Sequence, residues 1–427
     1  MTNRFEDSAA FAAALDAKDP LKGLRARFYC KPGVIYMDGN SLGLCSKDAE
    51  ACVLHALEVW KNDAINIWSA EESKYFLYPS YLGAKVASLI GAEPCEVTLT
   101  NSTTVNIHQC LATFYKPTPA RYKILVDDLN FPTDSYAVAS QLRLHGLEPD
   151  TALKVVKSPD GRRIDEDALI AAMTEDVALA LLPSALYRSA QLLDMARLTA
   201  AAHARGVLIG WDLCHSIGVV PHALDACAPD FAVWCNYKYL NGGPGTVAGL
   251  YINRRHFAIA PGLAGWQGNK KETQFQLRDT HEPSPDADGW LTGTPPILSM
   301  AALEGALRIT EEAGMPAIRE KSLQLTAYLM YLIDERLTKY GFQVGNPRED
   351  AARGGHVALE HDEAWRICRA LKDRGVIPDF REPNVVRLAP APLYTSFSDV
   401  RRLVDILEDI AANRLYAQYD AARALVV

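Results

Sequence analysis

The central half of the chain constrains the fold most strongly, because apolar runs alternate there with helical patterns. Between about residues 80 and 255, short runs such as VALALLP (177–183) and VLIGWD (207–212) are apolar at nearly every position. Segments with helical spacing lie between them, such as MARLTAAAHARG (195–206), which ends at a glycine. Strands that are apolar on both faces and alternate with helices are typical of a mostly parallel sheet covered on both sides. The sequence therefore predicts an α/β domain.

The C-terminal part of the chain has the pattern of a second, smaller unit. Two long helical stretches, from about residue 297 to 340, are followed by a strand, a helix, a strand and a final helix. A chain of 427 residues also exceeds what one hydrophobic core usually serves. We therefore predict a large domain over residues 46–310 and a small α+β domain over 311–427, with residues 1–45 packed against the small domain.

The composition narrows the partners and the compartment. A net charge of −8 argues mildly against nucleic acid or an anionic membrane as partner. The nine cysteines are scattered without a CxxC pair, which is typical of a reduced cytoplasmic chain and not of a disulfide framework or a zinc site. No run of about 18 apolar residues predicts a membrane span, and acids near the N-terminus do not fit a secretory signal. We expect a cytoplasmic protein without a metal, a nucleic-acid partner or a membrane partner.

Polar side chains follow two of the earlier predicted strands. In open parallel sheets, ligands bind at the carboxyl ends of the strands. Thr103 and Thr104 begin a helix after the strand EVTLT (96–100), where backbone N–H groups and hydroxyls can hold a phosphate. Plain helix capping is the simpler explanation of that segment taken alone. Phe131 and Asp134 flank a proline turn after the next strand, which otherwise has the pattern of an ordinary connection.

Two later strands end in groups suited to a buried reaction. Asp212 ends the strand 207–212, either as a helix cap or as the partner of a buried cation, and His215 follows it. A lone histidine of this kind is more often a satisfied core residue than a catalyst. Lys238 lies at the end of the apolar run 231–239, where burial lowers the pKa of a lysine and suits it to form a Schiff base. The alternative is a lysine that extends its amine from a strand end into solvent.

Taken together, these segments predict one cofactor. Pyridoxal phosphate (PLP) needs a phosphate seat, an aromatic ring against its face, a carboxylate at its pyridine nitrogen and a lysine for its aldehyde. The chain supplies these groups in the order Thr103, Phe131, Asp212 and Lys238. This order resembles the aspartate-aminotransferase type of PLP enzyme, fold type I. The resemblance implies a large domain with a mostly parallel sheet flanked by helices and a smaller α+β C-terminal domain.

A closer resemblance, to kynureninase, spans residues 36 to about 407. The lysine segment and the C-terminal segment are the most specific of those that carry it: YMDGNSLGL, NSTTVNIH, NFPTDSYAVASQ, DLCHSIGVVP, WCNYKYLNGGPGTVAGLYI, GWQGN, GTPPILS and DFREPNVVRLAPAPLYTSFSDV. Kynureninases are PLP-dependent enzymes of tryptophan catabolism that hydrolyse the Cβ–Cγ bond of kynurenine to anthranilate and alanine. The resemblance implies this kynurenine-pathway activity, on kynurenine or a related β-aroyl alanine.

The resemblance also implies roles for individual residues. The implied catalytic residues are Lys238, which forms the Schiff base, Tyr237, which exchanges protons, and Asp212, which pairs with the pyridine nitrogen. The residues implied to contact the cofactor are Thr103, Thr104, Phe131, Asp134, Ser184, Asp212, His215, Tyr237, Lys238, Trp266 and Thr294. Those implied to contact the substrate are Asn40, Ser41 and Arg387, the last through the substrate carboxylate. Trp266 and Thr294 would reach the phosphate of a neighbouring subunit, which implies a homodimer with shared active sites.

Three segments depart from the family pattern. Ser184 stands in an altered cofactor segment, LPSALYRSAQ (182–191), and Gln267 and Asn269 replace a usual phenylalanine and histidine. The segment 68–81 differs most, at the place where the family meets the aryl group of the substrate. It carries the aromatic residues Tyr75, Phe76, Tyr78 and Tyr81. Either these residues line an altered pocket that prefers a substrate other than plain kynurenine, or they pack a loop onto the domain.

Two other functions remain compatible with the sequence. The same cofactor serves aminotransferases, decarboxylases and cysteine desulfurases. A desulfurase needs an acceptor cysteine on a mobile loop, whereas Cys368 has the spacing of the apolar face of a helix. The second alternative is a catalytically silent binding protein of the PLP fold, which the presence of both Asp212 and Lys238 disfavours.

Overall fold

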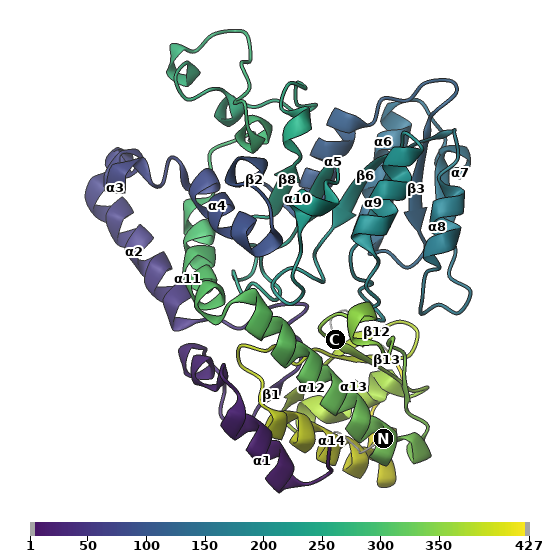
Figure 1. The fold of residues 1–427 in the computed structure, drawn as a ribbon. Coiled ribbons are helices and arrows are strands. Elements are labelled where there is room, and N and C mark those ends of the chain that lie inside the picture. Colours follow the sequence, from purple (N-terminus) through teal and green to yellow (C-terminus); the bar gives the residue numbers. More distant parts are fainter. Residues whose placement is uncertain (1–4, 423–427) are drawn as a thin grey trace.

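Three sheets organise the chain: one of seven strands, one of four and one of two (Figure 1). The computed structural model describes residues 5–422. Residues 1–4 and 423–427, which fall in the predicted N-terminal segment and small domain, lie outside the described residues. None of the helices within residues 5–422 is long and apolar enough to span a bilayer.

The larger sheet has seven strands in the order β2-β8-β7-β6-β5-β3-β4. Their bounds are β2 Val97–Leu99, β3 Lys123–Asp127, β4 Leu153–Val156, β5 Val177–Pro183, β6 Leu208–Asp212, β7 Phe231–Trp234 and β8 Gly249–Ile252. Within this sheet only β8 runs against its neighbours, and the pairs from β4 to β7 are parallel. The predicted α/β class with a mostly parallel sheet is therefore confirmed. The four central strands are almost wholly buried, because helices cover both faces.

The helices of this part connect the strands or flank the sheet. They are α2 Lys47–Asp63, α3 Ala70–Ser73, α4 Tyr78–Ile90, α5 Thr103–Phe114, α6 Pro132–Leu144, α7 Pro149–Ala152, α8 Glu166–Ala172, α9 Met195–Ala204, α10 Leu224–Cys227 and α11 Ile297–Ala313. Local chemistry fixes several starts: the hydroxyl of Ser102 accepts the N–H of Val105 before α5, and the carboxylate of Asp194 accepts the N–H of Arg197 before α9. These caps satisfy N–H groups that would otherwise lack partners at the helix starts.

The run predicted as a strand up to residue 239 ends earlier than expected. β7 stops at Trp234, so Lys238 lies in the turn beyond the strand and not at its end. The reason is tertiary. The N–H of Cys235 bonds to Cys214 Sγ at 3.2 Å, and the side chain of Asn236 donates to the carbonyl of Val247 at 2.6 Å. The chain therefore leaves the ladder four residues before the lysine.

The smaller part contains a four-stranded antiparallel sheet in the order β12-β13-β10-β9 and a two-stranded parallel pair, β1 with β11. The bounds are β1 Ile35–Tyr36, β9 Gln343–Val344, β10 Val357–Glu360, β11 Val376–Ile377, β12 Asp379–Arg381 and β13 Val385–Leu388, with helices α1 Ala9–Lys18, α12 Met315–Arg336, α13 Ala364–Asp373 and α14 Phe397–Ala412. Ala12, Ile35 and Met37 from the N-terminal region belong to the buried cluster of this part. Gly314, with φ of +73°, separates α11 from α12.

One long connection leaves the large sheet. Between β8 and α11 the chain runs through short 3₁₀ turns, among them η5 Trp266–Gly268 and η6 Gln274–Gln276. Figure 1 shows this segment, in green, extending beyond the sheet. It exposes the large apolar side chains of Phe275 and Leu277. These residues make no contribution to the core of the chain that bears them.

Candidate active site

One cavity, of about 230 Å³, gathers most of the predicted site residues. It lies beyond the carboxyl end of β6, between the large sheet and the small domain. Its lining residues come from both parts of the molecule: Asn40, Ser41, Thr103, Thr104, Phe131, Thr133, Asp212, Cys214, His215, Tyr237, Lys238, Arg381 and Arg387. The residues lie far apart in the sequence, so the cavity exists only in the folded chain.

The amine of Lys238 contacts an imidazole. Its Nζ lies 2.8 Å from Nε2 of His215. Burial, followed by the positive charge of Lys238, lowers the pKa of His215 well below its usual value. His215 is therefore neutral at physiological pH and its Nε2 accepts from the lysine, which places the ring proton on Nδ1. That Nδ1 atom is buried without a hydrogen-bond partner among residues 5–422.

Two carboxyl groups lie deep in the large domain beside the lysine. Asp212 ends β6, and one of its carboxylate oxygens accepts the N–H of Cys214 at 2.8 Å. Burial raises the pKa of Asp212, while the hydrogen bond from Cys214 and the charge of Lys238 oppose the rise. Asp134, in α6, has its pKa raised well above the usual value by burial and then by the charge of Asp212. A cationic ring nitrogen beside these groups would relieve both penalties.

The N-terminus of α5 forms another wall. Thr103 and Thr104 are its first residues, and Thr104 Oγ1 lies 2.7 Å from Thr133 Oγ1. Free N–H groups and hydroxyls at a helix start form an anion seat. The ring of Phe131 is 39% exposed, and Lys238 Nζ lies 6.0 Å from its centre. Tyr187 packs edge-on against this ring with the two centres 5.5 Å apart.

The small domain contributes a fully buried guanidinium. Arg387, in β13, donates from Nη2 to Ser41 Oγ at 2.7 Å and from Nη1 to the carbonyl of Tyr187 at 2.8 Å. It also forms an ion pair with Asp379. Beside it, both polar atoms of the Asn40 side chain are buried without hydrogen-bond partners among the described residues. Buried amides are rarely left unsatisfied, so Asn40 has the environment of a side chain that meets a ligand.

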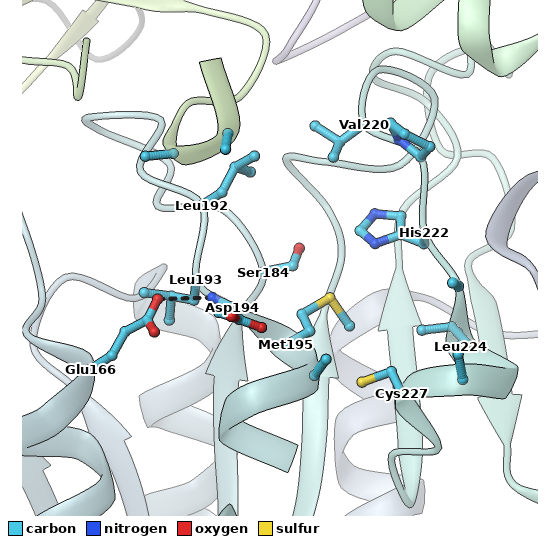
Figure 2. Close-up of a pocket in the computed structure, with 16 residues that line it drawn as sticks. Glu166, Ser184, Leu192, Leu193, Asp194, Met195, Val220, His222, Leu224 and Cys227 are labelled. Atoms are coloured by element: carbon cyan, nitrogen blue, oxygen red, sulfur yellow. Dashed lines mark hydrogen bonds between the residues drawn. The ribbon is translucent and has the colours of Figure 1, made fainter. Parts of the chain in front are cut away.

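The structure leaves some predicted residues outside this cavity. Ser184 lies on a second cavity of about 550 Å³, which Figure 2 shows with Leu193, Met195 and His222 around it. Its hydroxyl bonds to Ser216 Oγ at 2.6 Å and to the carbonyl of Asp212 at 3.1 Å. Ser184 therefore holds the backbone behind Asp212 and does not face the predicted cofactor seat.

Trp266 and Thr294 also lie apart from the cavity. Trp266 is 41% exposed and Thr294 is exposed, on the connection that leaves the large sheet. The aromatic residues of segment 68–81 do not line the cavity either. Tyr75 and Tyr78 are buried in the core, and the Tyr78 hydroxyl donates to Glu304 of α11 at 2.6 Å. Of the two interpretations of that segment, the contacts fit packing onto the domain.

Four residues near the reaction centre were not predicted: Thr133, Cys214, Arg381 and Asp379. The first two adjoin predicted residues in the sequence, so the motifs already contained the signal. Asp379 and Arg381 lie two residues apart in DFR, a spacing that puts both side chains on one face of a strand. That spacing is the feature of the sequence from which the proximity of Asp379 and Arg381 could have been predicted.

Comparison with known proteins shows the family of the chain. A family model described as the kynureninase C-terminal domain matches residues 318–407. The chain is 53% identical over 421 residues to a kynureninase of Geobacillus thermodenitrificans (strain NG80-2), covering 99% of this chain and 98% of that protein. It is 49% identical to a kynureninase of Shouchella clausii (strain KSM-K16), with 97% of each chain covered. The chain belongs to the kynureninase family.

Solved structures with the same fold are more distant in sequence. A cysteine desulfurase from Thermococcus onnurineus NA1 matches with a TM-score of 0.77 at 17% identity, covering 93% of this chain and 99% of that one. A variant of C-DES with glycine covalently linked to its PLP cofactor also has a TM-score of 0.77 at 17% identity, covering 90% and 99%. The fold is therefore that of the type I PLP enzymes, and the cofactor is PLP. Family membership disfavours the alternatives of aminotransferase, decarboxylase, desulfurase and silent binding protein.

Proposed function

We propose that the cavity carries out the PLP-dependent hydrolysis of the Cβ–Cγ bond of kynurenine, with Lys238, Asp212 and Arg387 as its principal residues. One observation supports this assignment most directly: an amine, a buried carboxylate and a buried guanidinium from three separate elements line a single cavity. A PLP enzyme that acts on an amino acid needs these three groups for the aldehyde, the pyridine nitrogen and the substrate carboxylate. Asn40 and Ser41 are the further substrate contacts that we propose.

The residues present fit PLP. The anion seat at Thr103 and Thr104 suits its phosphate, and the exposed face of Phe131 suits its ring. When bound, PLP supplies an electron sink that stabilises negative charge next to the substrate amine. Asp212, whose carboxylate accepts the N–H of Cys214 and lies near the positive charge of Lys238, is the group placed to pair with a protonated pyridine nitrogen. Asp134 and His215 complete the proposed set of groups around the ring.

Two side chains are placed to act as general acids or bases. Burial raises the pKa of Tyr237, so its phenol keeps a proton at physiological pH and can donate it. The amine of Lys238, held 2.8 Å from Nε2 of His215, is the second group placed to move a proton. A positioned acid or base of this kind contributes about 10²–10⁴-fold to a proton-transfer step. Arg387 fixes the amino-acid end of the substrate, which sets the distance from these groups to the bond that breaks.

We also propose that the protein is a cytoplasmic homodimer. Each chain would consist of a large domain over residues 46–310 and a small domain over residues 311–427, with residues 1–45 packed against the small domain. The nine free cysteines support a reducing compartment. The exposure of Trp266, on a segment that extends beyond its own sheet, supports a role in a neighbouring subunit.

Product identification tests the proposed function. The purified protein with PLP should convert kynurenine to anthranilate and alanine in equal amounts, measured by chromatography. The variant Lys238→Ala serves as the control for non-enzymatic cleavage. Release of pyruvate or of a new keto acid, without anthranilate, would contradict the hydrolase assignment.

A further inference from the structure

Arg387 alone does not complete a binding site for the substrate carboxylate. Its side chain is 0% exposed, and both of its terminal nitrogens already donate to the protein. Both N–H groups of Nη2 are used, and what remains is Nε, buried without a partner among residues 5–422, and one N–H of Nη1. A carboxylate binds most strongly to a guanidinium through two parallel N–H groups. Since Nη2 of Arg387 is shared between Ser41 and Asp379, a second donor is needed at the same place.

Arg381 supplies such a donor. It lines the same cavity as Arg387, and its side chain is 30% exposed, so it is the more accessible of the two guanidinium groups. Its Nε donates to Asp379 Oδ2 at 2.7 Å, and its Nη2 lies 3.4 Å from Ser41 Oγ. Its guanidinium carbon lies 6.0 Å from the ring centre of Tyr187, which restricts its position further.

The strand register explains why the three charged groups meet. Asp379 and Arg387 are direct cross-strand partners in β12 and β13, so their side chains project from the same face. Arg381 lies two residues after Asp379 in β12 and therefore projects from that face too. Asp379 Oδ2 contacts both guanidinium groups, so one carboxylate is shared between two cations.

The charge balance leaves room for an anion. Asp379 neutralises one of the two arginines. The other carboxyl that faces the pair is Asp38, and burial followed by the charge of Asp379 raises its pKa to about 6. Asp38 forms no ion pair with either arginine among residues 5–422, so Asp379 is the one carboxylate in contact with both guanidinium groups there.

We propose that Arg381 binds the substrate carboxylate together with Arg387, and that Asp379 is a positioning residue that holds the two guanidinium groups side by side. The inference deepens the proposed function and rests on it. It assigns to the small domain a two-arginine carboxylate site where the family resemblance implied one arginine. The alternative is that Arg381 serves only to hold Asp379 in place.

A substrate that lacks the negative charge separates these two roles. The experiment compares kcat/KM for kynurenine and for kynurenine α-carboxamide, in which an uncharged amide replaces the carboxylate. If the carboxamide is turned over too slowly, its inhibition constant against kynurenine gives the same comparison. For Arg381→Gln we expect kcat/KM for kynurenine to fall about 10- to 100-fold, as expected for loss of a hydrogen bond to a charged group. The carboxamide should change less than about threefold, because it makes no charged contact to lose.

Three further variants define the outcome. Arg381→Lys should recover part of the loss, because it keeps the charge without the planar fork. Asp379→Asn should weaken kynurenine binding while the absorbance of bound PLP is kept. Arg348→Gln is the matched control, since Arg348 forms an ion pair with Asp334 at 2.6 Å but does not line the cavity. It should leave the preference for the carboxylate unchanged.

An equal loss for both compounds in Arg381→Gln would overturn the inference and assign Arg381 a structural role. The failure of the proposed function is a different result: the wild-type protein would release no anthranilate. If Arg387→Gln lowers the preference for the carboxylate and Arg381→Gln does not, only the second cation is refuted.

Discussion

Lys238 lies between a neutral imidazole and an aromatic ring, and both neighbours limit what its amine can do. The imidazole of His215 offers an acceptor at 2.8 Å, and the ring of Phe131 lies 6.0 Å away. These two contacts fix the position of the amine, which is the group that would react with the aldehyde of PLP.

Reduction with borohydride should fix PLP covalently on Lys238. We expect peptide mapping by mass spectrometry to place the pyridoxyl group on the peptide that contains this residue. Lys238→Ala should give no covalent label. The control Lys85→Ala removes a lysine that pairs with Glu311 away from the cavity and should be labelled like the wild type. A label on any other lysine would refute the assignment.

Arg387→Lys should keep PLP and lose affinity for the substrate. A lysine cannot reproduce the contacts of a planar guanidinium, so we expect KM for kynurenine to rise about 10- to 100-fold with a smaller change in kcat. The absorbance of bound PLP should be unchanged, because Arg387 belongs to the other domain from Lys238 and Asp212. An unchanged KM would instead indicate that Arg387 is only the ion-pair partner of Asp379.

At the scale of elements, Asp230 joins two central strands at the edge opposite the cavity. It precedes β7, and one of its carboxylate oxygens accepts the N–H of Ile209 in β6 at 2.7 Å. The same carboxylate contacts His256 at 2.8 Å and Arg255 at 2.7 Å. Burial acts to raise the pKa of Asp230, but these three contacts outweigh it and lower the pKa. The ionised carboxylate therefore stabilises the fold.

Asp230→Asn should destabilise the protein at neutral pH and less so in acid. A carboxyl whose pKa is lower in the folded state contributes stability above its unfolded value, near 3.9, and loses it as the pH falls through the folded value. Breaking a buried ion pair costs about 3–5 kcal/mol. We expect Asp230→Asn to lower the free energy of unfolding, measured in urea, by about this amount at pH 7. The difference between the variant and the wild type should narrow as the pH falls below about 4.

A surface aspartate nearby provides the control for this comparison. Asp225 pairs with Arg254 at 3.4 Å, and both side chains are about half exposed. Asp225→Asn should change the free energy of unfolding by no more than about 1 kcal/mol, because solvent screens exposed pairs. If Asp230→Asn changes the free energy of unfolding at pH 7 as little as Asp225→Asn does, the buried carboxylate of Asp230 does not stabilise the contact between β6 and β7.

At the scale of the whole molecule, an ion cluster joins the four-stranded sheet to the part of the chain that carries the seven-stranded sheet. Glu360 of β10 is nearly buried and pairs with Arg188, which follows β5, and with Arg162 from the loop before α8. Arg188 is adjacent to Tyr187, whose carbonyl accepts from Arg387. The domain contact and the carboxylate site thus share one loop.

A mixture of two inactive variants should test the proposed dimer with shared sites. Lys238→Ala removes the reactive amine, and Trp266→Ala removes the group proposed to serve the neighbouring subunit. In a heterodimer, one of the two sites would combine an intact Lys238 with an intact Trp266. Random re-association of equal amounts should therefore restore about a quarter of wild-type activity. Light scattering should give the mass of two chains, and an active monomer would refute the proposal.

The sequence alone determined the features that depend on local pattern. The apolar run VALALLP became β5 with the predicted bounds, Val177–Pro183, because a strand buried on both faces has a continuous apolar signal. The start of α5 and the lysine segment were likewise predictable, because a helix cap and a sequence motif each involve only a few consecutive residues. For these reasons the fold class and the cofactor were predictable, and the predicted residues Thr103, Asp212 and Lys238 line one cavity.

Only the tertiary structure decided features that depend on contacts between distant segments. β7 ends at Trp234 because Cys235 bonds to a thiol 21 residues earlier in the chain, which no local pattern records. Ser184 faces a different cavity because it holds the backbone of Asp212 from behind. The meeting of Arg381, Asp379 and Arg387 depends on the pairing register of β12 with β13. The pairing register of strands depends on packing over the whole chain. The positions of these three charged side chains relative to one another could therefore be known only from the folded structure.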